Sequence, residues 1–104
     1  MAEFVTVGSK TDVTPGNCIS VEIKGRGIAL LNVNGTIYAL DNTCPHAGGP
    51  LGEGTLDGEV IECPWHGWQF NVKTGERLSN PELTVECFSV RLNGDQIQVA
   101  LPKE

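Results

Sequence analysis

Short turn signals that recur between runs of β-forming residues restrict the fold of this chain more than any other feature. Asn34-Gly35 and Asn93-Gly94 each lie between two such runs. Asn and Gly both tolerate positive φ, so an Asn-Gly pair in this setting predicts a two-residue β-hairpin. Further turn pairs border short runs at Pro15-Gly16, Asp57-Gly58 and Thr74-Gly75. Because no long stretch has helical periodicity, an all-β antiparallel sandwich or small barrel is expected.

Domain organisation follows from length and from one irregular segment. The chain has 104 residues, so residues 1–104 are predicted to form a single domain. No internal repeat or linker divides it. From Asn42 to Gly58 the pattern is that of a loop, which is long for a compact domain. Loops of that length are usually functional, so something is expected to hold this one in place.

The charge balance and the hydropathy exclude some classes of partner. With 7 basic and 13 acidic residues the net charge is -6, which argues against nucleic-acid binding. It favours contact with basic protein surfaces. No apolar run approaches the ~20 residues that span a bilayer. The N-terminal residues do not have the pattern of a secretion signal, so no membrane contact and a cytoplasmic location are expected.

Both histidines of the sequence lie close to cysteines. Cys44 and His46 form a Cys-x-His pair, Cys63 and His66 form a Cys-x-x-His pair, and sixteen residues separate the two pairs. Thiolate and imidazole ligands together select zinc or iron–sulfur chemistry rather than calcium or magnesium. The four residues are therefore candidate metal ligands.

Three interpretations of these pairs compete. The four residues could be ordinary core side chains, although both histidines then follow cysteines by coincidence. They could hold structural zinc, but zinc modules usually pair Cys with Cys and His with His. They could instead hold a [2Fe-2S] centre with two His on one iron and two Cys on the other, to which mixed pairs are well suited.

The motif Cys44-Pro45-His46 … Cys63-Pro64-Trp65-His66-Gly67-Trp68 resembles the signature of Rieske-type ferredoxins. The resemblance implies one [2Fe-2S] cluster per chain, with Cys44 and Cys63 on the inner iron and His46 and His66 on the outer iron. It also implies the Rieske iron–sulfur fold, which has an antiparallel β base and a small cluster-binding lobe. That lobe would span about residues 43–71 and would account for the irregular loop.

This chain differs from the high-potential members of the family at positions that influence the reduction potential of the cluster. Those members carry a disulfide near the cluster, whereas Gly48, Gly49 and Trp65 occupy the corresponding neighbourhoods here. They also place Ser and Tyr hydroxyls two and four residues after the second histidine, where this chain has Trp68 and Phe70. Fewer hydrogen-bond donors stabilise the reduced cluster less, so a low potential within the Rieske range is expected.

Residues around the motif have simpler expected roles. Cys18 and Cys87 lie in strand-like runs and are predicted to be inert core thiols. Trp68 is predicted to pack in the core, whereas Trp65, within the ligand motif, is predicted either to pack in the lobe or to shield the cluster and contact a partner. Acidic residues that could steer a basic partner are Glu53, Asp57, Glu59 and Glu62.

The resemblance implies a soluble one-electron carrier rather than an enzyme. Its partners would be a flavoprotein NAD(P)H reductase and a terminal oxygenase of the ring-hydroxylating type. An alternative is the small Rieske-like subunit of an assimilatory NAD(P)H nitrite reductase, in complex with the large subunit. A zinc-stabilised interaction module is a third possibility, and it would be colourless.

Overall fold

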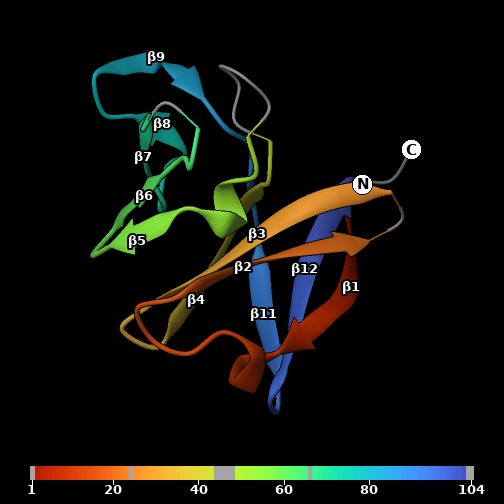
Figure 1. The fold of residues 1–104 in the computed structure, drawn as a ribbon. Coiled ribbons are helices and arrows are strands. Elements are labelled where there is room, and N and C mark those ends of the chain that lie inside the picture. Colours follow the sequence, from red (N-terminus) through yellow and green to blue (C-terminus); the bar gives the residue numbers. More distant parts are fainter. Residues whose placement is uncertain (1, 24, 44–48, 66, 103–104) are drawn as a thin grey trace.

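The computed structural model describes residues 2–23, 25–43, 49–65 and 67–102, and these form antiparallel β-sheets. Figure 1 shows three sheets, with two 3-10 turns at η1 (Lys10–Asp12) and η2 (Leu51–Glu53). The all-β prediction is confirmed. None of the helices in the described part of the chain is long and apolar enough to cross a membrane.

Two of the sheets form the base of the molecule. The outer sheet has the order β1-β12-β11 and contains β1 (Ala2–Ser9), β12 (Gln96–Pro102) and β11 (Val90–Asn93). The central sheet has the order β10-β4-β3-β2 and contains β10 (Cys87–Phe88), β4 (Thr36–Asp41), β3 (Arg26–Val33) and β2 (Cys18–Ile23).

The third sheet, here called the lobe sheet, lies on the other side of the central sheet (Figure 1). It has the order β5-β6-β7-β8-β9. Its strands are β5 (Thr55–Asp57), β6 (Val60–Glu62), β7 (Gln69–Asn71), β8 (Glu76–Arg77) and β9 (Asn80–Thr84). The predicted lobe, residues 43–71, overlaps the first three of these strands, and its boundaries stay a prediction.

Strand β3 is buried on both faces because it separates two hydrophobic cores. Ile28 and Leu30 point into the core shared with the outer sheet. Ala29 and Leu31 point the other way, into the core shared with the lobe sheet. Side chains alternate along a strand, so the nearly continuous apolar run here fits a strand with both faces covered. The lobe thus packs against the central strand of the base.

The hairpin signals of the sequence correspond to hairpins in the structure. Asn34 and Gly35 have φ of 52° and 95° and join β3 to β4, as predicted. The second hairpin joins β11 to β12, but Asn93 pairs with Gln96. The turn is therefore Gly94-Asp95, one residue later than expected, and Gly94 supplies the positive φ of 62°.

Two sequence expectations about continuity are wrong. The β-forming run before Asn93-Gly94, residues 87–92, was expected to be one strand but is not, because Cys87 and Phe88 pair with β4 whereas Val90 onward pairs with β12. The chain passes from one base sheet to the other at Ser89, and so closes the base. The predicted loop 42–58 also contains strand β5 at Thr55–Asp57, which forms a short hairpin with β6.

Candidate metal centre

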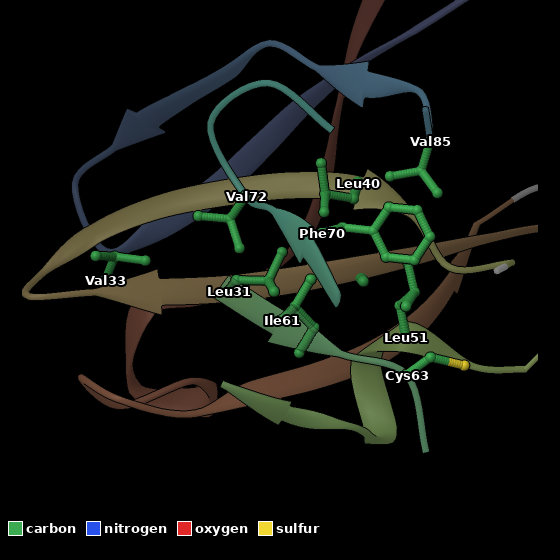
Figure 2. Close-up of a cluster of buried hydrophobic side chains, with 10 residues drawn as sticks. Leu31, Val33, Leu40, Leu51, Ile61, Cys63, Phe70, Val72 and Val85 are labelled. Atoms are coloured by element: carbon green, nitrogen blue, oxygen red, sulfur yellow. The ribbon is translucent and has the colours of Figure 1, made fainter. Parts of the chain in front are cut away.

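Cys63 is the predicted ligand that the structure describes, and it lies directly after β6. Its side chain is buried at the edge of the lobe core, with the sulfur directed away from the packed side chains (Figure 2). Its backbone N–H donates to the carbonyl oxygen of Trp68 at 2.8 Å, which closes the chain between them into a tight turn. Gly67 has φ of 72° in this turn, a conformation that side chains with a Cβ rarely adopt. Cys63, Gly67 and Trp68 of the second predicted ligand loop therefore belong to one hydrogen-bonded turn.

The sulfur of Cys63 accepts a backbone hydrogen bond from within this turn. The Trp65 N–H donates to Cys63 Sγ at 3.4 Å. A donor of this kind stabilises negative charge on a sulfur ligand. The turn thus presents a buried sulfur with a donor already aimed at it.

Gly49, at the end of the first predicted ligand loop, packs directly against this turn. A Cβ on Gly49 would lie 2.9 Å from Cys63 Sγ and 2.9 Å from Trp65 Cγ. Only glycine permits so close an approach. Gly49, from the first predicted ligand loop, and the turn after β6 therefore meet at Cys63 although they are far apart in sequence.

The base of the first loop is closed by Asn42, which the sequence interpretation did not single out. Its Oδ1 accepts the N–H of Gly52 at 2.7 Å and the hydroxyl of Ser20 at 3.2 Å. Its carbonyl oxygen accepts the N–H of Leu51 at 2.8 Å. Thr43 and Pro50 form an isolated β-bridge beyond it. The sequence did contain a signal for this role, because Asn42 is a polar residue between a strand and a long loop. Side chains of this kind commonly form hydrogen bonds with nearby backbone groups.

The remaining predicted ligands, Cys44, His46 and His66, lie outside the described residues. Within the described ranges, no three His, Cys, Asp or Glu side chains gather in a way that could hold a metal ion. The donor chemistry at Cys63 nevertheless fits an iron–sulfur cluster. The backbone N–H that donates to the buried sulfur would compensate negative charge on it. The missing Cβ of Gly49 leaves space beside the sulfur.

The sequence matches the Rieske [2Fe-2S] domain over residues 3–91. The chain belongs to the Rieske [2Fe-2S] family. It binds one [2Fe-2S] cluster per chain, as its family does. The predictions of family, fold class and cofactor are confirmed.

Relatives of this Rieske protein include components of oxygenase systems. It is 38% identical over 93 residues to the ferredoxin component of naphthalene 1,2-dioxygenase/salicylate 5-hydroxylase systems from Ralstonia sp, covering 89% of this chain and 88% of the relative. A chain in the complex of reduced oxygenase and oxidized ferredoxin in carbazole 1,9a-dioxygenase is 38% identical, with a TM-score of 0.85 and coverage of 93% and 92%.

A further structural neighbour comes from another enzyme class. It is a putative NADH-dependent nitrite reductase small subunit from Mycobacterium tuberculosis, with a TM-score of 0.88 and coverage of 100% and 99%. It shares only 22% of its residues with this chain, so the likeness concerns the fold.

The two tryptophans of the Rieske motif have different environments. Trp65 is 50% exposed, although it follows the buried Cys63 by two residues. Trp68 is partly buried and packs against the lobe core, with its ring centroid 6.5 Å from that of Phe70. The prediction of core packing for Trp68 is confirmed, and the exposure of Trp65 leaves it available for contact.

The acidic residues near the Rieske motif are all exposed: Glu53, Asp57, Glu59 and Glu62. Two of them have partners among the residues that the structure describes. Glu59 pairs with Lys73 at 3.3 Å, and Glu62 accepts a hydrogen bond from Gln69 at 3.4 Å. The other two present their carboxylates to solvent on the lobe.

The two cysteines outside the motif are not equivalent. Cys18 is half-buried against the lobe core, and its thiol donates to the carbonyl oxygen of Gly54 at 3.5 Å. Burial raises the pKa of this thiol. The prediction that Cys87 is a core thiol is wrong, because β10 is an edge strand and the residue is exposed. Partial burial, and then the charge of Glu86, raises the pKa of the Cys87 thiol. Both thiols are therefore neutral near pH 7.

Proposed function

We propose that this Rieske protein is a one-electron carrier of low potential within the Rieske range, itself without catalytic activity. It would pass electrons from a flavoprotein NAD(P)H reductase to a terminal oxygenase. The observation that carries this is the near-complete match in length to ferredoxin components of oxygenase systems at 38% identity. When bound, a [2Fe-2S] cluster with four protein ligands supplies reversible one-electron transfer without an open coordination position.

The proposed ligand set is Cys44 and Cys63 on one iron, and His46 and His66 on the other. The support is the Cys-x-His and Cys-x-x-His spacing together with the approach of Gly49 to Cys63. Within a single domain of residues 1–104, we take residues 43–71 as the cluster-binding lobe.

A low potential is supported by the side chains that follow the second ligand turn. Trp68 and Phe70 provide no hydroxyl, and Phe70 is fully buried in the lobe core. A buried apolar ring cannot donate to a sulfur. Since hydrogen bonds to cluster sulfurs raise the potential, this arrangement favours a value near the bottom of the Rieske range.

Docking to both partners is proposed to use the lobe around Trp65. An exposed Trp beside a buried ligand can be covered by a partner surface, as aromatic anchors are in many interfaces. The exposed carboxylates nearby would attract basic residues of that partner. The setting we propose is the cytoplasm, with which the unpaired thiols of Cys18 and Cys87 are compatible.

The nitrite reductase alternative depends on similarity of fold alone. The relevant neighbour shares 22% identity, against 38% for the oxygenase ferredoxin component. We therefore propose the oxygenase role.

Stopped-flow transfer to a ring-hydroxylating terminal oxygenase tests this proposal. The reduced protein should be reoxidised by the oxygenase, and Trp65→Ala should slow the bimolecular step about tenfold or more without changing the midpoint potential. A matched control is Leu92→Ala, since Leu92 is similarly exposed at 45% but lies on β11 of the base.

Two results would overturn the proposal. Failure of the loaded protein to exchange electrons with any ring-hydroxylating oxygenase would remove the oxygenase role. Equal slowing by Trp65→Ala and Leu92→Ala would remove the docking role of the lobe.

A further inference from the structure

We propose that Arg77 is a positioning residue that holds a positive charge against the second ligand turn and thereby raises the midpoint potential of the cluster. The inference rests on the proposed function. It concerns a residue outside the ligand motif, on the short strand β8.

The Arg77 guanidinium lies over the aromatic ring of Trp68. Its Cζ is 3.3 Å from the ring centroid, closer than the 5.0 Å of Arg26 over Phe88 and the 4.2 Å of Arg91 over Phe4. Cation–π contacts of this kind are strongest on tryptophan and when partly desolvated.

Trp68 connects Arg77 to the buried ligand. Its carbonyl oxygen accepts the N–H of Cys63 at 2.8 Å, and its ring packs against the core to which Cys63 belongs. On the other side, Arg77 pairs across the strands with Phe70. The guanidinium therefore stacks on the ring of a residue whose backbone carbonyl is hydrogen-bonded to Cys63.

Arg77 differs from the other cation of the lobe sheet's β7–β8 hairpin. Lys73 is exposed and forms an ion pair with Glu59 at 3.3 Å. Arg77 is half-buried, and among the described residues it forms no salt bridge, while its Nε is buried without a hydrogen-bond partner. A carboxylate would neutralise this charge locally. The structure instead places the charge on an aromatic face, where no carboxylate of the described residues pairs with it.

A cation beside the ligand turn favours the state with more negative charge. Reduction adds one electron to the cluster, so a nearby positive charge stabilises the reduced form and raises the potential. The effect is larger for a half-buried charge than for an exposed one, because water and salt screen it less. Arg77 would thus offset part of the lowering expected from the missing hydroxyl donors.

Redox titration followed by EPR on the cluster-loaded protein tests this role. Arg77→Gln and Arg77→Met should lower the midpoint potential, whereas Arg77→Lys, which keeps the charge, should stay near the native value. Lys73→Gln and Arg91→Gln are matched controls, because each removes one positive charge from an ion pair or from a remote cation–π contact. Both should leave the midpoint nearly unchanged.

The outcomes separate this inference from the proposed function. If Arg77→Gln and Arg91→Gln shift the midpoint equally, or Arg77→Lys shifts as far as Arg77→Gln, the charge role is contradicted. If both neutral variants lose the cluster while Arg77→Lys retains it, the charge serves to hold the cluster rather than to set its potential, and the inference is contradicted. If Arg77→Lys also fails to retain it, the residue is structural only. Absence of a Rieske EPR signal in the native protein would instead overturn the proposed function.

Discussion

The base and the lobe of this molecule are built on opposite faces of the same strand, yet they are stabilised differently. The base joins long strands, and β1 pairs with β12 over seven residue pairs. The lobe sheet consists mostly of short strands, with three residue pairs each between β5 and β6 and between β6 and β7. Sheets of such short strands are marginal on their own. We therefore expect the lobe to depend more than the base on contacts beyond its own strand pairing, namely its core against β3 and the cluster.

The same contrast explains what the sequence could predict. Part of the base followed from a local signal, since Asn34-Gly35 between two β-forming runs predicted the hairpin of β3 and β4. The burial of both faces of β3 was not predicted and is a finding of the structure. The passage of the chain from one sheet to the other at Ser89 has no local sequence signal. It depends on β10 pairing with β4, which is distant in sequence, whereas β11 pairs with β12.

At the site, ligand spacing predicted the family and the cofactor, but not the supports of the ligands. The closure by Asn42 and the stack of Arg77 on Trp68 depend on contacts between segments distant in sequence. No pattern within either segment determines them. The exposure of Cys87 was missed for the same reason, since it depends on β10 lying at a sheet edge.

The largest expected effect comes from removing a sulfur ligand. Cys63→Ser, like Cys44→Ser, should abolish the visible colour and the EPR signal, because an alcohol does not replace a cluster thiolate. Circular dichroism should show that the base keeps its strands. Cys18→Ser is the control and should keep the colour. Retained colour in Cys63→Ser would contradict the ligand assignment.

An intermediate effect should distinguish the two faces of β3. Leu30→Ala and Leu31→Ala remove equal, fully buried side chains from the base core and the lobe core, respectively. Each should lower the free energy of unfolding by about 2–5 kcal/mol. Leu31→Ala should in addition accelerate cluster loss, measured by bleaching in the presence of a chelator. Equal bleaching rates for the two variants would mean that the lobe core does not support the cluster.

The smallest effect concerns the exposed thiol at the edge of the base. The charge of Glu86 helps to raise the pKa of Cys87, so Glu86→Gln should lower that pKa and increase alkylation by iodoacetamide at pH 8 by roughly two- to fivefold. Cys18 is the internal control, because burial alone raises its pKa. An unchanged or slower rate at Cys87 would contradict the influence of Glu86.

The most direct test of the account is a redox titration of the purified native protein, followed by EPR. We predict a reddish-brown protein with one Rieske [2Fe-2S] cluster per chain and a midpoint potential near the bottom of the Rieske range, roughly −150 mV. A colourless protein that contains zinc, or a midpoint near the top of that range at about +300 mV, would contradict it.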